Sequence, residues 1–178
     1  TTVGFAGGFS RRAELIASAE RASYATFGFL ALAAVGLWTA LLRSDFSFRY
    51  VASYTSANLP SIYKFTAFWA GQSGSLLLWA FILSAYSAIA VYSNRSRNRE
   101  LMPYVTATLS AITLFFVMTL CFGSNPYERL DWIPPDGTGL NPQLQNPGMA
   151  IHPPNLYLGY IGTAVPFAAV KLAGPGSF

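Results

Sequence analysis

Tyr104-Val-Thr-Ala-Thr-Leu-Ser-Ala-Ile-Thr-Leu-Phe-Phe-Val-Met-Thr-Leu-Cys-Phe122 is an unbroken apolar stretch that has neither a charged side chain nor a polar face. A helix needs about 20 mostly apolar residues to cross the hydrocarbon core of a membrane. The Ser and Thr hydroxyls within the stretch can bond to carbonyls of their own helix, so they do not oppose burial in lipid. The stretch therefore predicts a transmembrane helix.

Three further segments have the same character: Ala22–Leu42, Ser75–Tyr92 and Asn155–Leu172. The last two are short and would need support from flanking interfacial residues. Hydrophobic residues make up 53% of the chain and charged residues 10%, whereas soluble domains carry about 25% charged residues. We therefore expect an all-α, polytopic transmembrane helical bundle of about four membrane helices. We expect the single Cys121 to be a small buried hydrophobe.

The connections between these segments predict the topology. Residues 1–21 are basic, as is the turn Ser93–Glu100, and such segments stay on the cytoplasmic side. The loops 43–74 and 123–154 then face outward; they are longer than a tight connection needs, and their aromatics and prolines predict ordered loops. Residues 22–172 would form one membrane domain.

The chain is interpreted as an internal piece of a larger membrane protein, with 173–178 as a truncated end. The formal charge of +4 is modest and does not indicate nucleic-acid binding. We expect the chain to be surrounded by membrane lipid. No serine-hydrolase, metalloprotease or Walker motif stands in a suitable context. Carboxylates are absent from the predicted spans, which excludes the usual machinery of ion-coupled transport.

His152 is the only histidine in the chain and stands before Pro153 and Pro154, where a polar loop meets an apolar segment. One interpretation is an interfacial histidine that caps a helix. The other is a metal ligand, because the prolines fix the backbone next to the imidazole and haem iron commonly takes histidine as an axial ligand. Nearby aromatics such as Tyr157 could pack on a porphyrin face.

A second motif runs from Trp69 to Trp79 and contains Gly71 and Gly74. On its own it indicates an aromatic belt at the membrane interface and close helix packing through the two glycines. Direct contact of the tryptophans with a cofactor is the alternative.

Several blocks of the chain occur in the order found in one family, the CcmF/NrfE-type cytochrome c haem lyases. These blocks are Arg43-Ser-Asp-Phe-Ser-Phe-Arg-Tyr-Val-Ala52, Leu59-Pro with Tyr63-Lys-Phe65, Trp69-Ala-Gly-Gln-Ser-Gly-Ser-Leu-Leu-Leu-Trp79, Ser124-Asn-Pro-Tyr-Glu-Arg129, Gly139-Leu-Asn-Pro-Gln-Leu-Gln-Asn-Pro-Gly148 and His152-Pro-Pro-Asn-Leu-Tyr-Leu-Gly-Tyr160. The chain therefore resembles the N-terminal half of that family.

The resemblance implies a component of cytochrome c maturation in the bacterial inner membrane. It would take haem from the haem chaperone CcmE and join it to apocytochrome c, alongside a CcmH-like thiol-reducing partner. His152 would be one axial haem ligand on the periplasmic side. The family's second outer histidine and its tryptophan-rich segment are missing here, so this piece alone is not expected to be catalytic. Ser73 replaces a usual Glu. A haem exporter, or a structural subunit in which His152 only caps a helix, are the alternatives.

Overall fold

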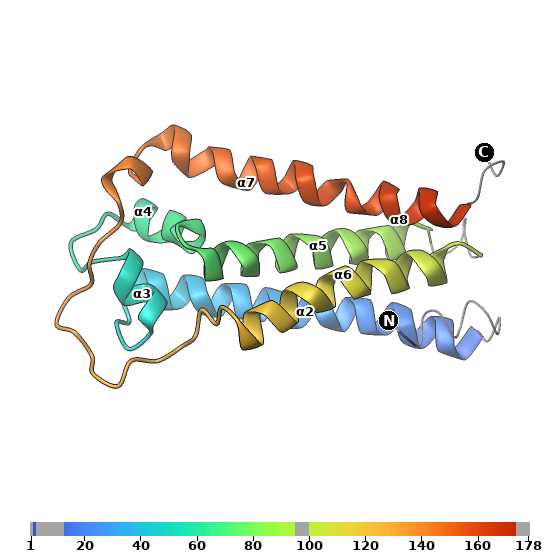
Figure 1. Ribbon diagram of the computed structural model, residues 1–178, viewed down its shortest axis with the longest axis horizontal. Helices are drawn as coiled ribbons and strands as arrows, with labels where there is room; N and C mark the ends of the chain where they lie inside the picture. The colour runs from blue at the N-terminus through green and yellow to red at the C-terminus, as the bar shows by residue number, and fades with distance from the viewer. Residues whose placement is uncertain (1, 3–12, 95–99, 174–178) are drawn as a thin grey trace.

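The computed structural model describes residue 2 and residues 13–94 and 100–173, and these described residues are helices and loops with no strand. The named elements are α2 (Ala13–Arg43), α3 (Arg49–Tyr54), α4 (Ser61–Thr66), η1 (Ala67–Trp69), α5 (Gln72–Asn94), α6 (Met102–Phe122), η2 (Pro142–Leu144), α7 (Pro147–Gly162) and α8 (Ala164–Ala173). The predicted helical membrane bundle is confirmed. Figure 1 shows the long helices running side by side, with the short elements gathered at one end.

Among the described residues, three helices are long and apolar enough to cross a membrane: α2, α5 and α6. They contain the expected spans 22–42, 75–92 and 104–122. Helix α2 begins at Ala13, earlier than expected, and carries Glu14, Glu20 and Arg21 in its additional turns. Those turns are too polar for the hydrocarbon core and extend the helix toward water.

The fourth expected span, 155–172, is two helices in the structure. Helix α7 begins at Pro147 because the Asn146 side chain accepts a hydrogen bond from the Gly148 N–H at 2.8 Å, which is the usual role of an N-cap. Proline is also well suited to the first helical position. The helix ends at Gly162, and Pro166 in α8 has no N–H to donate to the Gly162 carbonyl. These two features move the start and interrupt the middle of the expected span.

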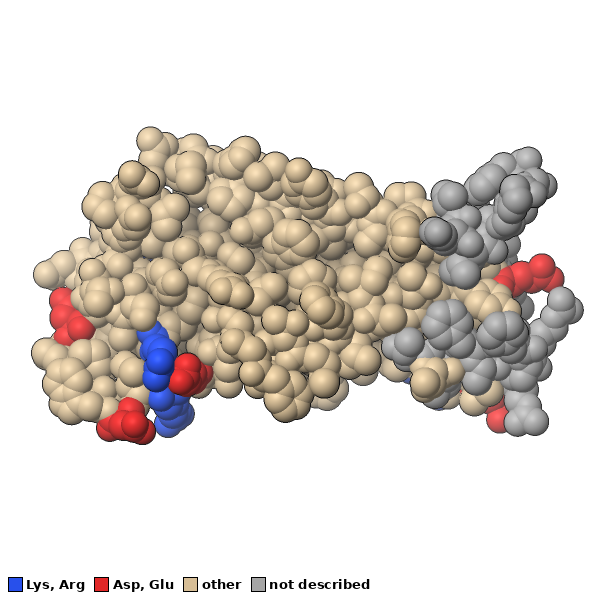
Figure 2. Space-filling model, viewed as in Figure 1, with Lys and Arg blue, Asp and Glu red and all other residues tan. Residues whose placement is uncertain are grey.

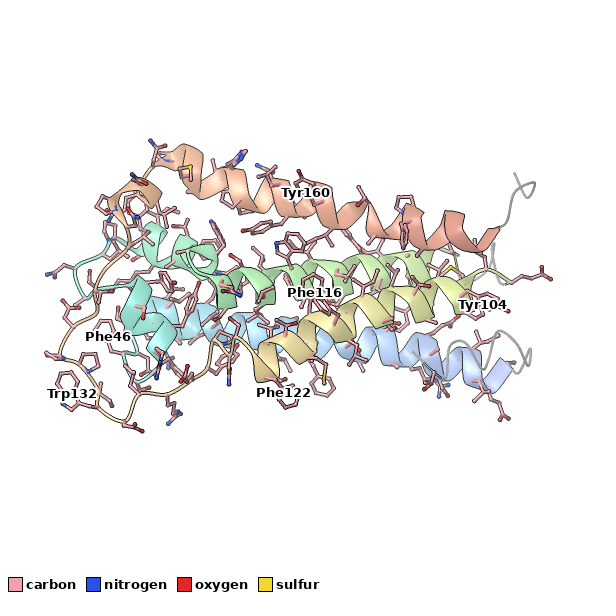
Figure 3. The ribbon with its side chains drawn as sticks, in the orientation of Figure 1. Phe46, Tyr104, Phe116, Phe122, Trp132 and Tyr160 are labelled. Atoms are coloured by element: carbon pink, nitrogen blue, oxygen red, sulfur yellow. The ribbon has the colours of Figure 1, made fainter. Side chains whose placement is uncertain are left out.

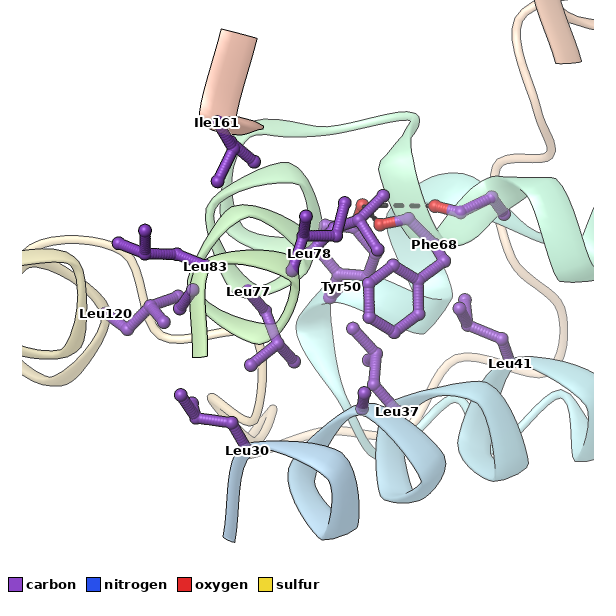
Figure 4. Packing of buried hydrophobic residues seen from close by; sticks show 14 of the residues in the cluster. Leu30, Leu37, Leu41, Tyr50, Phe68, Leu77, Leu78, Leu83, Leu120 and Ile161 are labelled. Atoms are coloured by element: carbon purple, nitrogen blue, oxygen red, sulfur yellow. Dashed lines mark hydrogen bonds between the residues drawn. The ribbon is translucent and has the colours of Figure 1, made fainter. Parts of the chain in front are cut away.

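Helix α5 lies at the centre of the bundle, between α2, α6 and α7 (Figure 1). Within the most apolar window of each helix, 61% of α5 is buried, against 28% of α2 and 33% of α6. Figure 4 shows the packing of α2, α5 and the η1 segment, where Leu37, Phe68 and Leu83 are at most 1% exposed. Cys121 differs from expectation: it is exposed on the bundle surface, because it lies on the side of α6 that no other helix covers.

The two long loops lie at the same end of the bundle and are bonded to each other. Phe48 and Arg129 form an antiparallel bridge, and the Arg49 N–H donates to the Glu128 carbonyl at 2.8 Å. Further along, the Thr138 N–H donates to Ala52 at 2.8 Å. The loops therefore form one ordered layer over this end, which we call the loop end.

Charged side chains lie at the two ends of the bundle and leave a charge-free belt between them on the face seen in Figure 2. Such a belt is what a membrane requires of lipid-facing surface. Of the basic residues used to predict topology, Arg21 is exposed at the far end of α2. Arg11, Arg12 and the arginines at 95, 97 and 99 lie outside the described residues.

Candidate functional site

His152 lies in the second turn of α7, not at the start of a helix. Its side chain is exposed and has no hydrogen-bond partner among the described residues. The N-cap role belongs to Asn146, whose side chain satisfies the Gly148 N–H. Nothing in this geometry makes His152 a cap, so its imidazole is available for another partner.

The surface around His152 on α7 is uncovered. With 3.6 residues per turn, Gly148, Asn155 and Gly159 share the His152 side of the helix, and all of them are exposed. A methyl group added at Gly159 would have no neighbour within 4 Å. Because Gly148 and Gly159 have no side chains, little protrudes from the helix on either side of the imidazole, and a flat group can approach it. We call this surface the His152 face.

Pro153 and Pro154 lie inside α7 and change its hydrogen bonding next to His152. Because neither residue has an N–H, the carbonyls of Met149 and Ala150 lack their usual helical donors. In contrast, the Asn155 side chain donates to the Ile151 carbonyl at 3.1 Å. Free carbonyls and an imidazole are unfavourable against lipid chains. This turn therefore belongs beside a polar partner or water.

Tyr157 and Trp79 lie on the other side of α7. Tyr157 is about 140° around the helix from His152, half-buried against α5. Its hydroxyl donates to the Ser75 hydroxyl at 3.3 Å, and its ring centroid is 5.4 Å from that of Trp79. The tyrosine in Figure 3 that does share the uncovered side is Tyr160, which is 67% exposed. Tyr157 and Trp79 thus hold α7 on the bundle and do not share the His152 side of the helix.

The Trp69–Trp79 motif forms the junction between η1 and α5. Gly71 and Gly74 are buried, and the neighbours that require glycine are residues of α3 and η1, not another membrane helix. A methyl group on Gly74 would be 1.8 Å from the Phe68 carbonyl oxygen, and one on Gly71 would be 2.4 Å from the Tyr54 ring. Close packing at the two glycines is therefore present, but it joins the loop layer to α5.

Tyr50 of α3 supplies the hydrogen bonds at this junction. Its hydroxyl donates to the carbonyls of Ala67 and Phe68, at 3.0 and 2.9 Å, and accepts from the Gly71 N–H at 3.0 Å (Figure 4). Burial raises the pKa of Tyr50 well above its usual range, so the phenol remains a donor. Trp69, half-buried at the end of η1, is placed by this arrangement, with its ring edge-on to Phe65.

Ser73 occupies the position where Glu was expected from the resemblance. Its hydroxyl is 2.8 Å from that of Ser124, at the point where α6 leads into the second long loop. A neutral hydroxyl pair joins α5 to that loop here. A carboxylate at this place would need a donor or a positive partner, and Ser124 supplies only one hydroxyl.

The described residues contain no group of three His, Cys, Asp or Glu side chains able to hold a metal ion. His152, as the only histidine, can supply one ligand and no more. That donor set fits one axial position of a haem iron and does not fit a structural zinc site, which takes four ligands.

Sequence reasoning did not predict the long-range hydrogen bonds of several tyrosines that build this region. Tyr50, Tyr63 and Tyr127 each bond to a backbone carbonyl far away in the sequence: Tyr63 reaches Gln145 at 2.9 Å, and Tyr127 reaches Ala33. Tyr63 thereby fixes the residue that precedes the α7 cap. Their only signal is that they fall within the blocks of family resemblance.

The family model described as Cytochrome C assembly protein matches residues 69–172, which include both the Trp69–Trp79 motif and His152. The chain belongs to this family. The cytochrome c-type biogenesis protein CcmF of Pseudomonas aeruginosa is 43% identical to it over 152 residues, covering 84% of this chain and 23% of the relative. The probable cytochrome c-type biogenesis protein NrfE of Escherichia coli is 42% identical over 151 residues, covering 84% and 27%.

A solved structure named Cytochrome c Heme Lyase CcmF has a TM-score of 0.79 and 26% sequence identity, and the match covers 97% of this chain and 27% of that one. The resemblance to the CcmF/NrfE type is thus confirmed. The chain spans about a quarter of the length of the curated relatives named above, 23% and 27%.

Proposed function

We propose that this chain forms part of a CcmF-type assembly protein in a bacterial inner membrane, and that His152 is one axial ligand of the haem that is joined to apocytochrome c. The observation that carries the proposal is the exposed imidazole of His152 on an uncovered helix face, free of any cap or hydrogen-bond role. Membership of the cytochrome c assembly family supports haem as the ligand.

The substrate chemistry sets what the His152 face must do. Each apocytochrome thiol adds across a haem vinyl group: a C–S bond forms, the vinyl double bond is lost, and the thiol proton goes to the neighbouring carbon. That step is redox-neutral and depends on positioning. Ligation by His152 would fix the iron, while Gly159, where an added methyl group would have no neighbour within 4 Å, leaves space for the ring.

The partners proposed from the family resemblance are the haem chaperone CcmE as donor, apocytochrome c as acceptor and a CcmH-like thiol-reducing protein. The loop end would then face the periplasm, with the His152 face directed toward these partners. A second histidine ligand would have to come from outside this chain, because His152 is its only histidine. A haem exporter would use the same ligand but would not increase holocytochrome yield.

The decisive experiment replaces His152 in membranes that carry the complete maturation machinery. For His152→Ala we expect loss of bound haem, measured by the Soret band of the purified protein, together with loss of holocytochrome c. Added imidazole should restore part of both. Asn155→Ala is the matched control because it truncates a neighbour on the same face, and it should retain haem. Unchanged haem in His152→Ala would remove the residue from the mechanism.

A further inference from the structure

A cavity of about 320 Å³ lies between α2, α5 and α6, apart from the His152 face. Its lining is rich in hydroxyls and has no charged or aromatic side chain. The hydroxyl-bearing residues are Ser23 and Thr26 from α2, Ser84 and Ser87 from α5, and Ser110 and Thr113 from α6. None of these residues belongs to the His152 face or to the loop layer.

The cavity begins near the membrane boundary opposite the loop end and reaches toward mid-bilayer. Counting back about 20 residues, the length of a span, from the end of α2 at Arg43 gives Ser23. Ser87 lies about 10 Å inside the end of α5 at Asn94, at a rise of 1.5 Å per residue. These lining residues therefore lie nearer to that side of the membrane than to the loop end.

The hydroxyls divide into two kinds. Four donate to carbonyl oxygens of their own helices and so present only lone pairs to the cavity: Ser23 to Ala19 at 3.2 Å, Thr26 to Ala22 at 2.8 Å, Ser84 to Phe81 at 2.7 Å and Thr113 to Leu109 at 2.9 Å. Ser87 is only 4% exposed, lines the cavity and has no hydrogen-bond partner among the described residues. Its oxygen is not one of the fully enclosed, unpartnered atoms of the described residues, so this hydroxyl opens onto the cavity.

Ser110 on the facing helix has no partner in the described part of the chain either. One turn before it, Thr106 is 2% exposed and its hydroxyl is also unpartnered. An occupant that satisfies the cavity as it stands would accept hydrogen bonds from Ser87 and Ser110 and donate to the bonded hydroxyls. Lipid chains can do neither, whereas water does both.

We infer that this cavity is a hydrated crevice, occupied by a cluster of water molecules that enter from the side opposite the loop end. Each buried water in a protein makes about three hydrogen bonds to polar groups, and the hydroxyls supply both donors and acceptors for them. At about 30 Å³ per water in the liquid, the cavity holds on the order of ten waters. The bundle thus carries water to hydrocarbon depth in one half of the membrane.

The test introduces a thiol and measures its reaction with a membrane-impermeant, cationic methanethiosulfonate reagent, which needs a hydrated thiolate. In a Cys121→Ser background, Ser87→Cys is nearly isosteric. Ile89→Cys is the matched control, at similar depth but on the outside of the bundle, since Ile89 is 59% exposed. We expect reaction at position 87 to be at least tenfold faster than at position 89, and only when reagent is on the side of the α5–α6 connection.

Ser110→Cys gives an independent reading from the opposite wall and should react from the same side. Equal reaction rates at positions 87 and 89 would overturn the inference, because they would show that the reagent reaches the cavity and the outside of the bundle equally well. Absence of reaction at both 87 and 110, with full reaction after denaturation in SDS, would also overturn it. The cavity would then be closed by lipid or by other protein segments. Neither result bears on haem ligation by His152.

Discussion

The Tyr157 and Trp79 rings contact each other at a centroid distance of 5.4 Å and join α7 to the central helix α5. The same tyrosine donates to the Ser75 hydroxyl at 3.3 Å. Because His152 lies little more than one turn earlier on α7, the position of its imidazole depends on this contact. In the proposed function Tyr157 is therefore a positioning residue, since it lies about 140° around the helix from His152.

The Tyr157 contact predicts different results for two substitutions. Tyr157→Phe keeps the ring and loses a long hydrogen bond, so its effect on stability should be below about 1 kcal/mol, with haem binding nearly unchanged. Tyr157→Ala removes the ring contact, and because Tyr157 is half-buried the loss should stay below the roughly 3–5 kcal/mol that removal of a fully buried aromatic costs. We expect weaker haem retention and a shifted Soret band. Equal haem retention in both variants would contradict a positioning role.

Gly74 should tolerate no side chain. A methyl group there would overlap the Phe68 carbonyl oxygen at 1.8 Å and the Tyr50 hydroxyl at 2.4 Å. Gly74→Ala must therefore displace the η1–α5 junction, and we expect little folded protein by size-exclusion chromatography in detergent. Gly28→Ala is the control, because nothing lies within 4 Å of the added methyl and a helical Gly to Ala change adds up to about 1 kcal/mol of stability.

The sequence predicted the bundle because its membrane spans are encoded locally, by uninterrupted apolar residues such as those of α6. It misplaced the start of α7. The apolar segment was expected to begin at Asn155, yet the Asn146 cap with Pro147 at the first position starts the helix eight residues earlier, and Pro153 and Pro154 are accommodated inside it. Exposure of Cys121 was likewise missed, because every side of α6 is apolar and periodicity cannot tell which side is packed.

The hydroxyl contacts of Tyr50 and Tyr127 were not predictable for a different reason. Each joins a side chain to a carbonyl in another element, Phe68 and Ala33 among them. Local sequence carries no pattern for such a bond, because the partner is a backbone carbonyl, which every residue type has. The sequence was enough to identify His152 as a candidate ligand. Only the folded structure shows that the helix face around it is uncovered.

Removing the Tyr50 hydroxyl should destabilise the junction between the loop layer and α5. In Tyr50→Phe the Gly71 N–H and the Phe68 carbonyl lose a buried partner, and unsatisfied groups of this kind cost about 1–3 kcal/mol. Tyr54→Phe is the control: its ring, 4.7 Å from that of Tyr50, is kept. Unfolding in increasing SDS, followed by tryptophan fluorescence, should separate the two variants. A Tyr54→Phe loss as large as that of Tyr50→Phe would show that the hydrogen bonds of the Tyr50 hydroxyl are not what stabilises the junction.

Tyr127 predicts a pH dependence at the loop end. Burial raises the pKa of Tyr127 to about 12, whereas an unfolded tyrosine titrates near 10. The folded state therefore holds the phenolic proton more tightly, and the resulting stability is full below about pH 10 and is lost as pH rises through about 12.

The measurement compares wild type with Tyr127→Phe by SDS unfolding at several pH values from neutral to strongly alkaline. At neutral pH wild type should be the more stable, because its hydroxyl bonds to the Ala33 carbonyl. That advantage should shrink above about pH 10, where the unfolded phenol ionises and the folded one does not. A constant difference across this range would mean that the phenol titrates alike in both states and that its burial has no effect on the proton.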